Sequence, residues 1–561
     1  MADHLIFFLY TVLIIHSTIG YGFLFSLIVD RELLKYNLGY IGIFGFFFIS
    51  LLSITTSFVV PHNFIHNSIL HVIGLTAFIF LLKKPIKFSE IKYFWILLLI
   101  FWIGLYVYKN HDDFPYYHLT YALNLSENSF AVGMGKFSHG FRTFSSLFYF
   151  HSTLYLPLIK FYLFHSGPFF IILFFNFIII SKLINHIKIN NFNFLFFYSL
   201  LSLLFINIAF YRIAEHGTDR SPQILLILIF LVFFETLYVE KKREIIRSKL
   251  SLLLIMVFFA SSMKAIYYLY LLLVPIIFLK KKLYKNILNK KNFLILFFIS
   301  ISFFLNLTVS YLNTGCLLYP AQKTCIVEQE WSLNKKEVNR MSLHYEWWSK
   351  AGGGPNYRSE IDPKIYVKNF NWVSNWIDRH FFNKVSDTLI GILFISIVVT
   401  LIFKTYSKYK KKSQIKIDYL LYLVPIIFLI EWFVNHPSMR YGGYVLFAIP
   451  IFLYTALKIE KYTLSKIIIK NITYTLIILS LLLFNVRNID RLIKENKVYN
   501  YNLVKSPYFF IENVVSEKVT DNNHYQIYSP KEGKMCWASK TPCSYKKDLK
   551  IKNFLWMNMV Y

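Results

Sequence analysis

The sequence predicts an all-α polytopic membrane protein with about 12–15 transmembrane helices, each an apolar run long enough to cross a bilayer. Of its 561 residues, 56% are hydrophobic and 16% are charged, which is more apolar than a soluble chain of this length can hide. The net charge is +30, yet Lys and Arg lie in short tracts between the apolar runs, such as 280–282 and 410–412. This distribution is typical of cytoplasmic loops and disfavours nucleic-acid binding.

Apolar runs along the chain give the expected transmembrane helices in order. The first four precede any large polar loop, at 5–28, 38–60, 65–82 and 93–108. The first run lacks a basic segment before it and is too long for a signal peptide, so we expect it to remain as a helix. Later runs follow the same pattern, at 169–184, 194–210, 224–239, 293–312, 388–403, 419–434, 441–457 and 472–484.

The stretch 251–278 is long for one crossing and short for two. Basic residues flank it on both sides, so both of its ends are expected on the cytoplasmic face. A tight helical hairpin with Lys264 near its apex satisfies both observations.

The basic tracts also predict which polar segments face outward. With the tracts around Lys83, Arg243, Lys281, Lys411 and Lys461 in the cytoplasm, four segments lie outside: 109–145, 211–220, 313–387 and 485–561. This assignment of sides holds only if the apolar segment 146–164 does not cross the membrane and is interfacial or re-entrant instead. If 146–164 crosses instead, 211–220 changes side.

We therefore divide the chain into five parts. They are N-terminal helices 1–108, a membrane core 109–312 that begins with the loop 109–145, an extracytoplasmic loop 313–387, C-terminal helices 388–484 and an extracytoplasmic tail 485–561.

The four cysteines form two close pairs, Cys316 with Cys325 and Cys536 with Cys543. Both pairs lie in segments that the charge pattern places outside, where disulfides persist. Metal ligation is the alternative, but neither pair has CxxC spacing or an obvious set of His partners. We expect small disulfide-bonded subdomains in the loop and in the tail.

An acidic pair directly follows the fourth apolar run. Asp112 and Asp113 suit general-base work or cation binding, because adjacent carboxylates at a membrane boundary raise one pKa while the other group stays ionised. Tyr116, Tyr117 and His118 follow as candidate substrate contacts. The alternative is an ordinary N-cap of a helix that begins at Phe114.

Three further segments carry charge in or beside the membrane, where charge is costly. Lys264 is a phosphate partner or a snorkelling side chain, and Arg440 is a phosphate-binding fork or an interfacial anchor. Gly442 and Gly443 would let a headgroup approach the backbone near Arg440. The loop 211–220 binds substrate or solvates a turn, with four candidates: Glu215, His216, Asp219 and Arg220.

Together these segments resemble the GT-C superfamily of integral membrane glycosyltransferases, especially the branch of aminoarabinose and dolichyl-phosphate-mannose transferases. The run Asp-Asp-Phe-Pro-Tyr-Tyr at 112–117 is similar to the acidic pair of the family's first outer loop. Met263–Ala265 is similar to its Thr-Lys-Gly segment, and Arg440-Tyr441 with Pro450 to its Arg-Tyr-Leu-Leu-Pro helix. The run 151–156 resembles the family's His-Pro-Pro-Leu-Tyr-Tyr start of a helix, which favours a crossing at 146–164.

The resemblance implies transfer of a sugar from a polyprenyl-phosphate carrier to an acceptor hydroxyl, with inversion, outside the plasma (inner) membrane of a bacterial cell envelope. Asp112 or Asp113 would be the base, and Lys264 and Arg440 would stabilise the lipid phosphate. The partners would be membrane lipid, the sugar donor and a glycan, lipid or protein acceptor. Two carboxylates can hold a divalent metal, but Lys and Arg neutralise a monophosphate without one.

Other classes of function fit the same composition. A polymerase or ligase of polyprenyl-linked glycans would favour Arg and His over an acidic pair in its outer loops. A transporter or flippase of envelope precursors often contains inverted repeats, which this sequence lacks. A non-catalytic membrane scaffold is the remaining alternative.

Overall fold

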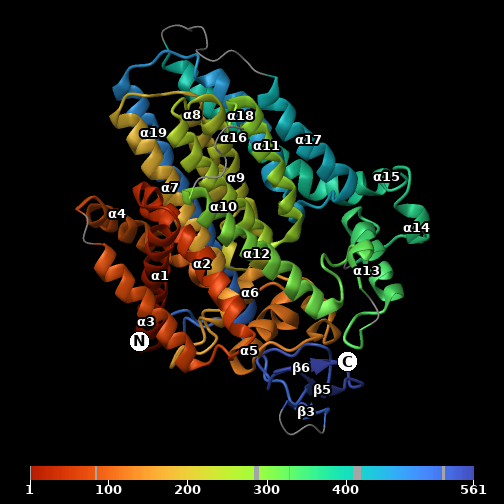
Figure 1. Cartoon of the computed structure of the whole chain (residues 1–561). Coiled ribbons are helices and arrows are strands. Elements are labelled where there is room, and N and C mark those ends of the chain that lie inside the picture. Colours follow the sequence, from red (N-terminus) through yellow and green to blue (C-terminus); the bar gives the residue numbers. More distant parts are fainter. Residues whose placement is uncertain are drawn as a thin grey trace.

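The structure is a computed structural model that describes residues 2–82, 85–215, 217–283, 290–326, 329–354, 356–407, 419–520 and 525–561. The described part is mostly helical (Figure 1). Within the described residues, ten helical stretches are long and apolar enough to span a membrane: α1 (Ala2–Val29), α2 (Leu38–Ser57), α3 (Phe64–Leu81), Lys87–Leu105 with most of α4 (Pro85–Phe101), α7 (Gly167–Lys188), α9 (Gly217–Tyr238), α10 (Arg243–Met263), Phe293–Thr314 of α12 (Lys290–Thr314), Val373–Thr405 ending with α16 (Ser386–Thr405), and α19 (Lys466–Tyr499). Three shorter apolar helices join them: α8 (Phe194–Ala209), α17 (Leu420–Asn435) and α18 (Gly443–Ile459). The predicted class of polytopic membrane protein is confirmed.

Burial separates central from peripheral helices. In α2 and α9, 89% of the most apolar stretch is buried within the protein, against 33% in α3, α4 and α12. Glycine allows the closest contacts: a Cβ on Gly45 of α2 would lie 1.7 Å from the carbonyl oxygen of Thr18 in α1. Such small residues let membrane helices approach closely, since lipid gives no hydrophobic drive for their association.

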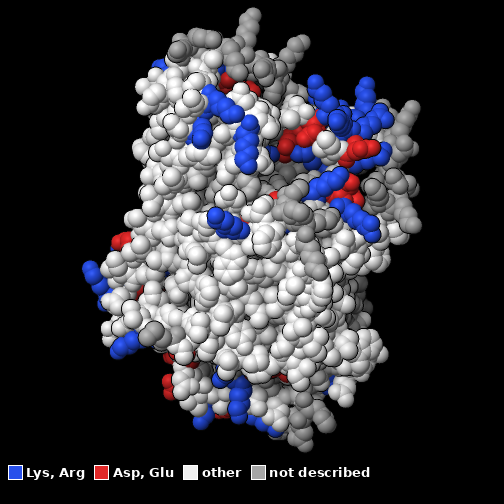
Figure 2. Space-filling model, turned by 90° about the vertical axis from the view of Figure 1, so that its left-hand side faces the viewer, with Lys and Arg blue, Asp and Glu red and all other residues white. Residues whose placement is uncertain are grey.

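Polar residues begin several of these helices. The side chain of Asn63 accepts hydrogen bonds from the backbone of Ile65 and His66 at the start of α3, and Asn193 accepts one from Phe196 at the start of α8. Such caps satisfy amide groups that have no partner within the helix. Between the ends, the outer surface is apolar, and the middle of the face in Figure 2 is almost free of charged side chains. This band matches the hydrocarbon core of a bilayer.

The stretch 251–278 forms the predicted hairpin. Helix α10 ends at Met263, Lys264 is extended, and the chain continues as the 3-10 helix η7 (Ala265–Leu272) and then α11 (Leu273–Lys281). The Lys281 side chain donates a 2.7 Å hydrogen bond to the carbonyl of Glu240, which precedes α10. The two ends of the hairpin therefore meet, and Lys264 lies at its apex.

The segment 146–164 does not cross. Its helix α6 (Ser146–Ser152) has only seven residues, and turns follow until α7 begins. Asn67, at the start of α3, donates to the carbonyls of Ser152 and Tyr155 at 2.9 Å. The segment thus enters and leaves at one end of the bundle, as expected of an interfacial or re-entrant segment. The crossing favoured by the run 151–156 is wrong, because the chain turns after two helical turns.

The four polar segments predicted to lie outside share this end, which we call the loop end. Arg142 of the first loop pairs with Glu337 of the large loop at 2.6 Å, and Val132 exchanges backbone hydrogen bonds with the tail. The basic residues Lys281 and Lys461 belong to segments at the opposite end, and the tracts at Lys83 and Lys411 lie outside the described residues.

The large loop and the tail form small parts outside the main helical bundle (Figure 1). The loop contains α13 (Lys335–Ser349), the hairpin β1 (Gly353–Gly354) and β2 (Tyr357–Arg358), α14 (Pro363–Tyr366), α15 (Val373–Trp376) and the π-helix η9 (Ile377–Val385), which continues into α16. The tail contains two antiparallel pairs, β3 (Ser516–Lys518) with β4 (Tyr528–Pro530) and β5 (Ile551–Phe554) with β6 (Met557–Val560). Both predicted disulfides, Cys316–Cys325 and Cys536–Cys543, are present.

One boundary is different from the prediction. Helix α19 continues to Tyr499, so residues 485–499, which we placed in the tail, are helical. The apolar run ends at 484, but the charged turns beyond it pack against the first loop, and Glu495 accepts a hydrogen bond from the backbone of Tyr108 at 3.0 Å.

Candidate functional site

Four charged side chains from distant parts of the chain meet at the loop end. Arg440 Nε lies 2.6 Å from Asp219 Oδ2, and Arg440 Nη2 lies 3.0 Å from Asp113 Oδ2. Lys264 Nζ lies 2.5 Å from Asp219 Oδ1. We call Asp113, Asp219, Lys264 and Arg440 the charged cluster. Two carboxylates and two cations balance its net charge, which lowers the cost of partial burial.

Local structure positions each member. Asp219 is in the first turn of α9, Lys264 is at the apex of the α10–η7 hairpin, and Arg440 is in the 3-10 helix η10 (Met439–Tyr441) before α18. Gln223, one turn after Asp219, donates to the carbonyl of Met439 at 3.2 Å and so ties α9 to η10. The cluster therefore depends on four separate segments folding together.

A close contact brings the first loop to α9. Gly217 has a φ of +44°, and a Cβ there would lie 2.8 Å from the His118 ring. His118 is buried, and its Nε2 has no hydrogen-bond partner among the described residues. Burial lowers the pKa of His118 from 6.5 to about 4, although Asp113 and Asp219 oppose that shift. The imidazole is thus neutral beside the charged cluster at pH 7.

The structure separates the two adjacent carboxylates. The side chain of Asp113 is 26% exposed and faces Arg440, and His111 Nδ1 lies 3.4 Å from the same carboxylate oxygen, Oδ2. The side chain of Asp112 is 81% exposed, and its nearest cation is Lys109 at 3.8 Å. Asp113 occupies the N-cap position of η3 (Phe114–His118), but its side chain makes no capping hydrogen bond. Its carboxylate is therefore directed to the cluster rather than to the helix.

Aromatic rings surround the two cations. Lys264 Nζ lies 4.4 Å from the centre of the Tyr441 ring, and Arg440 Cζ lies 5.6 Å from that of Trp348 in α13. The Asp219 carboxylate raises the pKa of Arg440 well above its ordinary value. Arg440 keeps 38% of its side chain exposed, so a ligand can reach the cluster from the loop side. Trp348 was not predicted from the sequence. The feature that could have indicated a role for it is the Trp347–Trp348 pair beside charged residues.

The tyrosines of the first loop point in different directions. Tyr117 is half-buried, and its desolvation and the nearby Asp113 raise its pKa well above 10. Tyr116 faces away from the cluster: its hydroxyl lies 3.2 Å from His139 Nδ1, and its ring stacks on Tyr545 of the tail. Tyr117 and His118 are thus placed beside the charged cluster, and Tyr116 is not.

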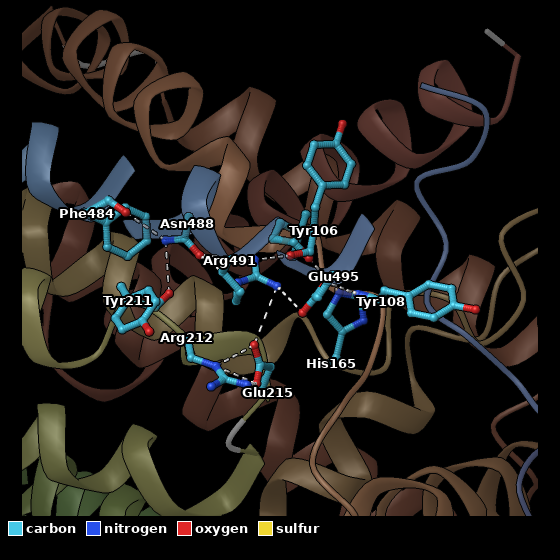
Figure 3. Close-up of polar contacts among 11 residues, drawn as sticks. Tyr106, Tyr108, His165, Tyr211, Arg212, Glu215, Phe484, Asn488, Arg491 and Glu495 are labelled. Carbon is cyan, nitrogen blue, oxygen red and sulfur yellow. Dashed lines mark hydrogen bonds and ion pairs between the residues drawn. The ribbon is translucent and has the colours of Figure 1, made fainter. Parts of the chain in front are cut away.

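Glu215 belongs to a second, buried cluster (Figure 3). Its carboxylate accepts hydrogen bonds from Nε and Nη2 of Arg212 and lies 3.6 Å from Arg491 of α19, which also pairs with Glu495 at 3.1 Å. The Glu215 side chain is only 5% exposed. This cluster joins α19 to the segments around Tyr106 and Glu215, so Glu215 holds elements together. Arg491 and Glu495 were not predicted from the sequence. Their i,i+4 spacing could have indicated an ion pair, but they follow the last apolar run.

Arg220, another candidate of the loop 211–220, lies apart from both clusters. Arg220 stacks between Phe210 and Tyr444, at 4.6 and 4.0 Å from the ring centres, and forms no ion pair in the described part of the chain. His216 lies outside the described residues. Among the residues described, no group of three or more His, Cys, Asp or Glu side chains is placed to hold a metal ion.

Comparison with protein families gives one match. A family model described as a domain of unknown function, DUF8201, matches residues 5–448. The matched region contains every member of the charged cluster and ends within α18, before α19 and the tail. Neither the curated proteins nor the solved structures contain a match to this chain.

Proposed function

The chain belongs to the DUF8201 family, and we propose that it is a membrane glycosyltransferase of the GT-C type. It would move a sugar from a polyprenyl-phosphate carrier to the hydroxyl of a glycan, lipid or protein acceptor, with inversion at the anomeric carbon. The observation that carries this proposal is the charged cluster, in which a carboxylate and two cations meet at one end of a membrane bundle. Those are the groups that such a transfer requires.

Asp113 is the proposed general base. The acceptor oxygen forms a bond to the anomeric carbon while the bond from that carbon to the phosphate oxygen breaks, and the acceptor proton passes to the Asp113 carboxylate. A base must lie within about 2.6–3.2 Å of the oxygen whose proton it takes. Asp113 is partly exposed and borders the cluster, whereas Asp112 faces away from it, so Asp113 suits this task better than its neighbour.

Lys264 and Arg440 are the proposed partners of the departing lipid phosphate. Charge develops on that phosphate in the transition state, and preorganised cations stabilise it without moving. Asp219 contacts both cations at 2.5 and 2.6 Å. Its role is to hold the ammonium and the guanidinium at a fixed separation, with Arg440 presenting its remaining donors as a fork.

The proposed location is the plasma membrane with the loop end outside. Two disulfides at that end support this orientation, because disulfides persist in oxidising compartments. Lipid-linked sugars of the cell envelope would be available to the charged cluster from the same side.

Profiling of surface glycans in cells with and without the protein tests the proposal. Loss of the protein is expected to remove one sugar from a surface glycan, glycolipid or glycoprotein, and the polyprenyl-phosphate sugar is expected to accumulate. Reintroduction of the wild-type chain should reverse both effects. Unchanged glycans and unchanged lipid-linked sugars would contradict the proposal.

A further inference from the structure

A cavity of about 330 Å³ lies in the large loop, away from the charged cluster, between β2, α14 and α15. Its lining contains Tyr357 and Tyr366, the polar side chains of residues 371, 374 and 375, and three charged groups: Arg358, Arg379 and Asp378. Two guanidinium groups against one carboxylate give the cavity a net positive charge.

Both guanidinium groups are held by aromatic rings rather than by acids. Arg379 Cζ lies 5.0 Å from the centre of the Tyr357 ring, and Arg358 Cζ lies 5.7 Å from that of Trp347. Neither forms an ion pair within the residues that the structure describes. A stacked guanidinium keeps the donors at its edge available, and that planar fork fits a phosphate or carboxylate.

The segment 361–382 supplies much of the cavity lining, and we call it the rim; its exposed side chains are mostly apolar or basic, with Asp362 as an exposed acid. Large apolar side chains on the segment 361–382 are exposed: Ile361 at 49%, Ile365 at 59%, Phe370 at 57%, Ile377 at 37% and Phe382 at 67%. Lys364 and Lys368 are exposed between them. Exposed Ile and Phe beside Lys are typical of a segment that lies in the interface of an anionic membrane.

The helical stretch that begins with α15 extends beyond the hydrocarbon core of the membrane to the cavity. The helical stretch Val373–Thr405 has 33 residues, which at about 1.5 Å per residue is roughly 50 Å, whereas the hydrocarbon core is about 30 Å thick. Its first turns therefore emerge among the headgroups. They carry residues 374, 375, 378 and 379 of the cavity.

We propose that this cavity binds the phosphate of an anionic phospholipid of the surrounding membrane. Arg358 and Arg379 contact the phosphate, and the apolar rim inserts beside the acyl chains. Bound lipid fixes α15, whose Trp376 donates a 2.6 Å hydrogen bond to the carbonyl of Pro437, three residues before Arg440. The lipid thereby steadies the segment that carries a cation of the charged cluster. Lipid binding in this cavity is a separate proposal, which does not depend on the proposed transferase activity.

Lipid retention measures the site directly. The full chain is placed in nanodiscs of phosphatidylcholine with a minor fraction of phosphatidylglycerol, and native mass spectrometry determines which lipid stays bound. The wild type is expected to retain phosphatidylglycerol. The double variant R358Q/R379Q should bind it roughly thirtyfold more weakly, since each Arg near an anionic surface contributes about a factor of five. The matched control R340Q/K335Q removes two exposed charges from α13 of the same loop and should retain it.

Hydrogen exchange of residues 356–379 in the wild type gives a second readout that needs no variant. Phosphatidylglycerol should slow exchange relative to phosphatidylcholine alone, and inorganic phosphate should not. The proposal is overturned if the two lipids protect the segment equally, if inorganic phosphate alone protects it, or if R358Q/R379Q retains phosphatidylglycerol as the control does.

Discussion

At the scale of single residues, the charged cluster assigns different roles to neighbours that look equivalent in sequence. Asp112 and Asp113 share a membrane boundary and a charge, but only Asp113 contacts Arg440. Glu215 and Asp219 lie four residues apart in one polar loop, and they belong to different clusters. A carboxylate in this protein is therefore defined by the cation it meets rather than by its place in a motif.

His118 makes the stability of the protein depend on pH. Its pKa is about 4 when folded and 6.5 when unfolded, so the unfolded chain binds more protons between those values. Stability from His118 is complete above pH 6.5 and is lost as pH falls from 6.5 towards 4. At about 1.4 kcal/mol per pKa unit, the loss approaches about 3.5 kcal/mol.

The variant His118→Phe should weaken that pH dependence, because its ring fills the same space without a proton. Thermal unfolding in detergent at pH 7 and pH 5 measures the effect. The melting temperature of the wild type should fall more between these pH values than that of the variant. Equal falls in both proteins would show that His118 is not buried in its neutral form.

At the scale of secondary structure elements, helix α19 is joined to the rest of the bundle by charge at its loop end. Arg491 lies between Glu215 and Glu495 and donates to the carbonyl of Tyr106 (Figure 3). The side chains of Arg491, Glu215 and Glu495 are 5–8% exposed. Removal of one partner from a buried ionic cluster costs about 3–5 kcal/mol, because a buried charge is left without compensation.

The variant Arg491→Met should therefore lower the melting temperature strongly. Lys494→Met is the matched control on the same helix: Lys494 pairs with Asp490 at 2.7 Å with the same i,i+4 spacing, but these side chains are 71% and 59% exposed. Surface pairs contribute about 0–1 kcal/mol, so the control should unfold near the wild-type temperature. Similar melting temperatures for the two variants would contradict a buried role for Arg491.

Some secondary structure elements agree with the prediction from sequence, and others differ from it. Basic tracts on both sides of 251–278 predicted the hairpin and the position of Lys264, since charge is excluded from the hydrocarbon core. The end of α19 was missed because its last turns are polar and leave the membrane, where hydropathy no longer marks a helix. The prediction that 146–164 is interfacial or re-entrant rested only on the number of crossings that keeps the basic tracts on one side of the membrane. The apolar sequence of the segment itself favoured a crossing.

At the scale of the whole molecule, the bundle gathers its polar loops and the charged cluster at one end. The first loop, the large loop, the start of α9 and the tail contact one another there. The sequence predicted this shared end from the positions of Lys and Arg. It did not predict the pairings within the charged cluster, because contacts between residues as distant as 113 and 440 depend on how the helices pack.

Cysteine labelling tests the proposed orientation. The four natural cysteines are in disulfides, so a single introduced cysteine reports its own side. A membrane-impermeant maleimide should label Ser359→Cys and Lys531→Cys in intact cells, and should label Lys461→Cys only after the membrane is opened. Labelling of Lys461→Cys in intact cells, with the other two protected, would place the loop end in the cytoplasm.

We propose that the charged cluster transfers a sugar with Asp113 as its base, and a comparison of Asp113→Asn with Asp112→Asn is the sharpest test of that role. Each variant replaces the wild-type chain in cells, and the glycan that depends on the protein is quantified at equal protein levels. Asp113→Asn should lower transfer by about 100-fold or more, as expected for loss of a general base. Asp112→Asn should stay near wild type. Normal glycans in the Asp113→Asn strain, or equal losses in both strains, would contradict the claim.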